Sequence, residues 1–119
     1  MLVKVLKSKL HRARVTSTKL HYAGSIAIDP ELMEAVGITP YESVVLADVT
    51  NGQRLETYAI PAEAGSGEVN ILGAAAHLIE KDDIIIIFAF GFCGADEAKN
   101  HKPKVVALDE SNAIIKRIS

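Results

Sequence analysis

Short apolar runs separated by turn signals make up most of the 119-residue chain. Runs rich in β-branched residues and bounded by Gly, Pro, Asn or Asp predict strands. The predicted strands are 2–6, 12–18, 44–49, 54–60, 69–71, 84–90, 104–108 and 113–118. The longest apolar run, 84–93, is too short to span a bilayer, which needs about 20 residues. It predicts a fully buried strand instead.

One segment between the strands carries the signals of a helix. Asp29 suits the N-cap, Pro30 suits the first helical position, and Glu31 favours the positive end of the helix. Gly37 is placed to end the helix, because glycine readily takes the left-handed conformation. The pattern therefore predicts a helix that begins after Asp29 and ends at Gly37.

The remaining turn-forming residues predict turns and short helical segments. Asn51-Gly52 is the strongest short hairpin signal, because both residues tolerate positive φ. The segment 73–77 predicts a tight turn into one or two helical turns, and 96–100 predicts another helical turn. Many short strands with few helices indicate a mainly β fold and suggest a closed barrel. The periodicity does not distinguish one barrel from another.

Composition and charge narrow the class of protein. Hydrophobic residues make up 49% of the chain and aromatic residues only 5%, so the core must be aliphatic. The formal net charge of -2 argues against a nucleic-acid binder, which would carry a basic excess. A single cysteine, Cys93, forms neither an internal disulfide nor a CxxC zinc site, and the first ten residues lack the apolar stretch of a secretory signal. We therefore expect a cytoplasmic protein that binds neither membrane nor nucleic acid.

Common catalytic signatures are missing from the sequence. It contains no GxSxG, GxxxxGK[ST], HExxH or GxGxxG motif. The histidines do not fall at metal-ligand spacing, so we expect no metal site; they are His11, His21, His77 and His101. Chemistry that depends on a bound phosphate or on these metal motifs is not indicated.

Short motifs stand in a fixed order along the chain. They are KLHR at 9–12, HYxGS at 21–25, TNGxR at 50–54, TYAI at 57–60 and GAAAH at 73–77. Each motif is weak alone, but the combination in so short a chain is highly specific. With these motifs, the chain resembles the pyruvoyl-dependent aspartate 1-decarboxylase (aspartate alpha-decarboxylase) family over essentially its full length.

The resemblance implies one domain, residues 1–119, folded as a six-stranded double-psi β-barrel with short helices. It also implies autocatalytic cleavage between Gly24 and Ser25 into a beta chain, 1–24, and an alpha chain, 25–119. A serine hydroxyl can attack the preceding carbonyl, and glycine has no Cβ to shield that carbonyl. A second pair, Gly65-Ser66, lies in a predicted flexible loop, and we interpret it as an ordinary loop.

In the family, the cleaved serine becomes a covalent pyruvoyl group, and the resemblance assigns this cofactor to Ser25. The group forms a Schiff base with L-aspartate and accepts the electrons that decarboxylation releases, which gives β-alanine and CO2 for pantothenate biosynthesis. Pyridoxal phosphate has the same electron-sink role in other enzymes. A cofactor within the chain accounts for the missing cofactor-binding motifs.

Candidate site residues follow from the motifs. Arg54 can grip a substrate carboxylate in a bidentate fork, and the resemblance places Lys9 near the substrate as a second cation. The phenol of Tyr58 can return a proton to the α-carbon. The resemblance associates Thr57 with substrate contact and self-processing. Neighbours on a regular strand point to opposite faces, so Thr57 and Tyr58 should share a pocket only at a bulge or a subunit boundary.

Small residues and two further side chains complete the candidate set. Gly73, Ala74 and Ala75 offer exposed backbone amides that suit an anionic group, and the resemblance makes them substrate-binding. His11 and Tyr22 lie within the motifs and are assigned supporting roles. On the residues alone, close packing of the small residues and structural roles for His11 and Tyr22 are equally good interpretations.

The sequence departs from the family's usual pattern at two positions. Leu72 stands where asparagine is common, and Asn70, two positions earlier on the same strand face, is a candidate to compensate. Ala47 stands where some relatives have a large aromatic residue, which would leave the pocket wall more open.

The resemblance also implies an assembly. It implies a homotetramer with active sites between subunits, and it leaves open whether a maturation factor assists cleavage. Two other functions remain as alternatives. One is a non-catalytic barrel that serves as a binding module. The other is a pyruvoyl enzyme for a different acidic amino acid, because glutamate differs from aspartate by one methylene, worth about 1–3 kcal/mol of discrimination.

Overall fold

The computed structural model describes residues 1–118, and the fold is mainly β with short helices, as the sequence predicts. The strands are β1 Leu2–Arg14, β2 Ser17–Lys19, β3 Ser25–Ile28, β4 Ser43–Asp48, β5 Arg54–Pro61, β6 Val69–Leu72, β7 Ile84–Gly94, β8 Lys104–Leu108 and β9 Ile114–Arg117. The helical pieces are α1 Pro30–Val36, the 3-10 helix η1 Gly73–His77 and α2 Ala95–Ala98.

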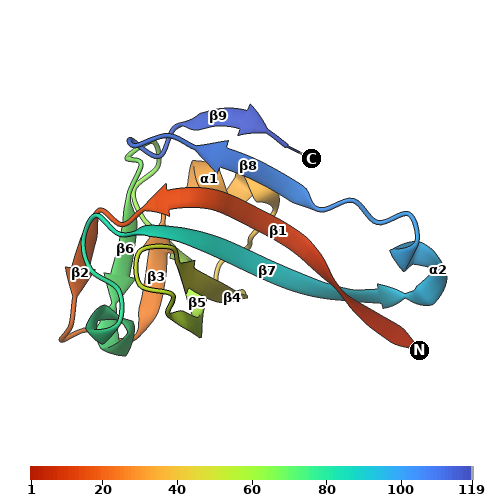
Figure 1. The fold of residues 1–119 in the computed structure, drawn as a ribbon, viewed down its shortest axis with the longest axis horizontal. Helices are drawn as coiled ribbons and strands as arrows, with labels where there is room; N and C mark the ends of the chain where they lie inside the picture. The colour runs from red at the N-terminus through yellow and green to blue at the C-terminus, as the bar shows by residue number, and fades with distance from the viewer. Residues whose placement is uncertain (119) are drawn as a thin grey trace.

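The strands form a 9-stranded sheet in the order β2-β6-β3-β5-β4-β7-β1-β8-β9 (Figure 1). This differs from the six strands expected, partly because short segments such as β2 (3 residues) and β9 (4 residues) pair at the two ends of the order. Most neighbours are antiparallel, but β1–β8, β3–β5 and β2–β6 are parallel. Mixed pairing between strands distant in sequence brings separate motifs together.

β1 is one long strand where the sequence predicts two. It pairs with β7 over most of its length, and register shifts lie between Leu6 and Ser8 and between Leu10 and Ala13. Arg12, inside the second shift, has a positive φ of 66°. These irregularities let a continuous strand cross polar positions that break the alternating pattern. The start of β1 and the end of β7 project together as a two-stranded arm (Figure 1).

β7 is buried on one face only, whereas the sequence predicts a fully buried strand. Its residues alternate: Ile85, Ile87 and Ala89 are buried, while the residues between them are partly exposed. The uniformly apolar run therefore has one face in the core and one face directed outward. This second face carries Phe88.

The predicted helix is confirmed. The Asp29 carboxylate accepts a hydrogen bond from the Glu31 amide at 2.9 Å, and Gly37 ends α1 with a left-handed φ of 76°. Asp29 also accepts from the amides of Gly65 (3.1 Å) and Gly67 (2.9 Å). The N-cap of α1 therefore also fixes the loop that precedes β6.

The predicted hairpin is confirmed too, with a longer turn than the motif suggests. β4 and β5 pair antiparallel on either side of residues 49–53, and Gly52 has a positive φ of 79° whereas Asn51 does not. The Asp48 carboxylate accepts from the amides of Thr50 (2.8 Å) and Asn51 (3.2 Å). A side-chain cap thus replaces the tight turn.

The core is aliphatic, as the composition requires. Its largest fully buried side chains include Leu10, Ile26, Ile28, Leu46, Ile71, Ile79, Ile85 and Ile87. All of them except Ile79, which lies between η1 and β7, come from strands, and they form one cluster with α1. Within residues 1–118, no helix is both long and apolar enough to cross a membrane.

Candidate active site

Gly24-Ser25 lies where β3 begins. Ser25 is 3% exposed and pairs with Leu72 of β6, while the next residue, Ile26, pairs with Ala59 of β5. The hydroxyl-bearing residue is therefore buried between two strands. Gly24, one residue earlier, borders open space.

That space is a pocket of about 470 Å³, which we call the Gly24 pocket. Its lining residues are Gly24, Leu55, Glu56, Thr57, Tyr58, Leu72, Ala74, Ala75 and Leu78. The structure therefore unites five predicted site residues that are scattered along the sequence. Leu55, Glu56 and Leu78 also line the pocket but lie beside the motifs, so the sequence did not indicate them. Leu55 and Leu78 have plain aliphatic side chains, whereas Glu56 carries a carboxylate, which accepts a hydrogen bond from Ser43.

Thr57 and Tyr58 both line this pocket, and β5 has no bulge there, which leaves a subunit boundary as the remaining alternative of the two that the sequence predicts. The β4–β5 register runs regularly from Ser43 opposite Tyr58 to Ala47 opposite Arg54. On its other side, β5 pairs with β3 only at Ala59, Ile60 and Pro61. The edge of β5 that faces away from β4 is thus unpaired before residue 59, and both faces of the strand can border a pocket there.

Gly73 packs against the Gly24 backbone and is absent from the pocket lining. Its φ is 82°, a left-handed value that glycine adopts without strain. A Cβ at this position would lie 2.6 Å from Gly24 Cα and 3.0 Å from the Tyr22 carbonyl oxygen. Close packing therefore explains why this position is glycine, and only Ala74 and Ala75 of the three small residues reach the pocket.

The two predicted cations lie together, but outside the Gly24 pocket. Lys9 Nζ is 5.6 Å and Arg54 Cζ is 5.2 Å from the centroid of the Phe88 ring. We call these residues the Lys9–Arg54 pair. Neither cation has an acidic partner within 4.0 Å among residues 1–118, so the pair presents uncompensated positive charge. Phe88, which no motif indicated, is the aromatic ring that both cations approach.

His11 lies on β1 close to this charge. Burial lowers the pKa of His11 from its ordinary value, and the positive charges of Lys9 and Arg12 lower it further. Its Nδ1 is buried and has no hydrogen-bond partner in the described part of the chain. Burial and the neighbouring cations therefore favour the neutral imidazole.

Tyr22 is half exposed, and Lys19 Nζ lies 5.1 Å from its ring centroid. Its carbonyl oxygen lies beside Gly73, but neither Tyr22 nor His11 lines the Gly24 pocket.

The two departures from the family pattern have different positions. Leu72 lines the Gly24 pocket. Asn70 does not, because its side-chain oxygen accepts hydrogen bonds from Thr16 (2.6 Å) and Ser17 (2.8 Å). Asn70 therefore joins β6 to the start of β2 and does not replace the missing polar group. Ala47 is not among the pocket-lining residues and lies opposite Arg54 in the hairpin.

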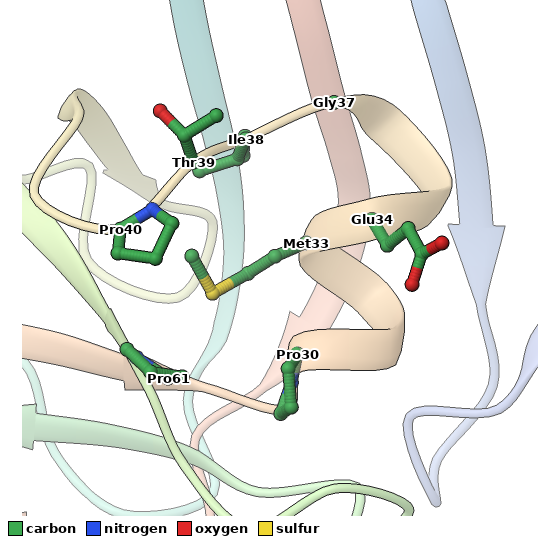
Figure 2. Close-up of a pocket in the computed structure, with 8 residues that line it drawn as sticks. All are labelled: Pro30, Met33, Glu34, Gly37, Ile38, Thr39, Pro40 and Pro61. Atoms are coloured by element: carbon green, nitrogen blue, oxygen red, sulfur yellow. The ribbon is translucent and has the colours of Figure 1, made fainter.

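A second pocket of about 310 Å³ lies between α1, the segment after it and Pro61 (Figure 2). Met33 and Ile38 line it together with three prolines. It shares no residue with the Gly24 pocket and has one charged side chain, Glu34. This pocket therefore lacks the groups that the predicted chemistry requires. Residues 1–118 contain no cluster of three or more His, Cys, Asp or Glu side chains that could hold a metal ion.

Comparison with known proteins connects this geometry to a family. Residues 1–115 match the family model described as aspartate decarboxylase. The chain is also 50% identical over 116 residues to the aspartate 1-decarboxylase of Caldicellulosiruptor saccharolyticus, an alignment that covers 98% of this chain and 91% of that protein. Both matches include the Gly24 pocket and the Lys9–Arg54 pair. The chain therefore belongs to the aspartate decarboxylase family.

Proposed function

We propose that this chain is an aspartate 1-decarboxylase, which removes the α-carboxylate of L-aspartate and yields β-alanine and CO2 for pantothenate synthesis. The observation that carries the proposal is the position of Gly24-Ser25. Ser25 is 3% exposed, and Gly24 borders the pocket that Thr57 and Tyr58 also line. A reactive group made from Ser25 would therefore adjoin a cavity with a hydroxyl and a phenol.

Ser25 generates its own cofactor in this proposal. Its Oγ attacks the Gly24 carbonyl carbon, and the amide becomes an ester with a free amine. Elimination breaks the Cβ–Oγ bond and leaves the carboxylate on Gly24. Hydrolysis of the resulting dehydroalanine releases ammonia and leaves a pyruvoyl group on a single-domain product that starts at residue 25. The close contact of Gly73 with Gly24 supports this step, because it fixes the backbone that must be attacked.

The pyruvoyl group supplies an electron sink for decarboxylation. The side chains bind and protonate the substrate. Lys9 and Arg54 bind its carboxylates, since a guanidinium and an ammonium without acidic partners favour an anion. Tyr58 donates a proton to the α-carbon from the wall of the pocket. Thr57, Ala74 and Ala75 contact the substrate there.

The site is completed by a second copy of the chain. The Lys9–Arg54 pair contacts Phe88 and does not line the Gly24 pocket of its own chain. A neighbouring copy can bring its pair to that pocket, which supports the homotetramer that the family resemblance implies. The substrate would then bind between subunits.

The strands belong to a double-psi β-barrel in this proposal. β1 and β2 are separated only by Val15 and Thr16, yet they stand seventh and first in the sheet order. So short a link spans about 11 Å at most. Such a link favours a sheet that curls until its first strand approaches β1. The Val15 amide donates to the Asp83 carbonyl and the Thr16 amide to the Val69 carbonyl, which supports such closure because the link is joined to the residue before β7 and to the first residue of β6.

We also propose a cytoplasmic location. The single cysteine, Cys93, is buried and free, which agrees with a reducing compartment. Cleavage by purified protein alone would exclude the need for a maturation factor.

The test is product formation by matched serine variants. The wild type should convert L-aspartate to β-alanine, with L-glutamate a poor substrate, measured by chromatography of the amino-acid products. Ser25→Ala should stay whole and form no product. Ser66→Ala is the control, because Ser66 also follows a glycine but lies in an exposed loop; it should be cleaved and active. Activity in Ser25→Ala would overturn the proposal.

A further inference from the structure

Tyr41 occupies a backbone position that disfavours tyrosine. The Glu42 amide donates to the Thr39 carbonyl at 3.1 Å, which makes residues 39–42 a β-turn with Pro40 second and Tyr41 third. Tyr41 has a φ of 69°. This combination is typical of a type II turn, whose third position favours glycine or asparagine. A bulky residue with positive φ is a genuine outlier, and such strain persists only where the surroundings enforce it.

The surroundings of Tyr41 do enforce it. The Tyr41 amide donates to the Ala59 carbonyl at 2.7 Å, and the Ala59 amide donates to the Glu42 carbonyl at 3.0 Å. The turn is thereby attached to β5 directly after Tyr58. Lys7 adds an ion pair to the Glu42 carboxylate at 3.0 Å. The direction in which the Tyr41 side chain leaves the backbone is therefore fixed.

Burial does not explain why a tyrosine is present. Tyr41 is 78% exposed, so its ring contributes little to the core. Its ring contact is with Tyr58, at 6.3 Å between centroids and a 31° interplanar angle. This separation lies within the range of attractive aromatic pairs. Tyr58 is itself 38% exposed and has no other aromatic contact among the residues described.

We propose that Tyr41 is a positioning residue for Tyr58: its ring restricts the Tyr58 phenol to the orientation in which that phenol lines the Gly24 pocket. The inference rests on the proposed role of Tyr58 as the proton donor. A phenol that must meet the α-carbon gains from being held before the substrate arrives. The strained turn provides this hold from outside the pocket, because Tyr41 is not among the pocket-lining residues.

The test compares Tyr41→Asn with Tyr41→Phe. Asparagine suits the turn but removes the ring, whereas phenylalanine keeps the ring and removes only the hydroxyl. The fully cleaved enzyme should be used, with cleavage verified by mass, and kcat and KM for L-aspartate should be measured. Tyr41→Asn should lower kcat about 2- to 10-fold with little change in KM, and its thermal midpoint should be unchanged or higher. Tyr41→Phe should retain the wild-type kcat.

A second measurement separates this inference from the proposed function. Tyr58→Phe should slow the enzyme severely, and adding Tyr41→Asn to it should cause no further loss. If Tyr58→Phe is slow but Tyr41→Asn is normal, or if Tyr41→Phe is as slow as Tyr41→Asn, the positioning role is wrong and the proposed function stands. A change confined to KM would also overturn the positioning role. If Tyr58→Phe retains full kcat, the proton-donor role is wrong, and this inference fails with it.

Discussion

Gly24 and Gly73 touch each other, but the uncleaved chain needs glycine at only one of these positions. A Cβ on Gly73 would lie 2.6 Å from Gly24 Cα, on a backbone with φ of 82°. A Cβ on Gly24 would meet only the Leu72 carbonyl oxygen, at 3.9 Å. Gly73 is therefore required by the fold, whereas Gly24 is available for chemistry.

This contrast predicts that alanine lowers the free energy of unfolding much more at position 73 than at position 24. In an uncleavable Ser25→Ala chain, Gly73→Ala should lower the free energy of unfolding by at least about 2 kcal/mol, because it combines a clash with a left-handed backbone. Gly24→Ala, the matched control, should change it by less than about 0.5 kcal/mol. Denaturant unfolding of the two variants measures both values. Equal losses would contradict the packing described for Gly73.

Arg54 should govern substrate affinity. Arg54→Gln removes a charged partner of the substrate carboxylate, worth about 1.5–3 kcal/mol, so KM should rise by about tenfold or more while self-cleavage proceeds normally. Arg54→Lys should recover only part of the affinity, since an ammonium lacks the bidentate fork. Steady-state kinetics with L-aspartate tests this, with the exposed Lys99→Gln as a control. An unchanged KM in Arg54→Gln would exclude the assigned role.

At the scale of elements, a buried acid pair lies where β4 ends. Asp48 is 2% and Asp83 is 8% exposed. Burial first and the interaction with Asp83 second raise the pKa of Asp48 from 3.8 to about 6, although hydrogen bonds from the Thr50 and Asn51 amides lower it. The second carboxylate oxygen of Asp48 has no donor within the described residues. Protonation therefore relieves an unsatisfied atom and the repulsion between the two carboxylates.

The raised pKa gives a definite pH dependence. Between pH 3.8 and about 6, the folded state binds more protons than the unfolded state, so this contribution to stability is greatest below pH 3.8 and is lost as the pH rises through about 6. Asp48→Asn keeps the acceptor oxygen and adds a donor toward Asp83. It should therefore raise the free energy of unfolding at pH 8 by about 1–3 kcal/mol and weaken its fall from pH 4 to 7. Urea unfolding of uncleavable chains tests this, and identical pH profiles would contradict it.

Elements with local causes could be predicted from the sequence. The ends of α1 follow from Asp29 and Gly37, whose capping contacts lie within one or two turns of the chain. β1 could not be predicted as one strand, because its bulges depend on pairing with β7 and β8. Likewise, the outward face of Phe88 is invisible in an uninterrupted apolar run and appears only in the β7 pairing.

For the whole molecule, the division of the candidate site is the central feature. The motifs indicated nearly all of its chemical groups, and five of the predicted residues meet at the Gly24 pocket. The motifs did not indicate that Lys9 and Arg54 lie together elsewhere, because that depends on the order of β5, β4, β7 and β1 in the sheet. Short-range sequence spacing carries no information about such an arrangement.

If active sites form between copies of the chain, two variants that are each defective should complement each other and restore activity when they assemble together. Ser25→Ala chains keep the Lys9–Arg54 pair, and Arg54→Gln chains keep the cleavage site. With random co-assembly after co-expression, about a quarter of the sites would combine both intact parts. Activity at low aspartate should therefore exceed the sum of the two separate preparations. Activity equal to that sum would mean that each chain builds its own site.

Self-cleavage is the central claim, and the intact mass of the purified, denatured protein tests it most directly, before and after warm incubation. The account predicts two fragments, residues 1–24 and 25–119, with the larger one lacking a free amino terminus because pyruvoyl replaces Ser25. A chain that remains whole, even after addition of an extract of its native host to supply a maturation factor, would contradict the account.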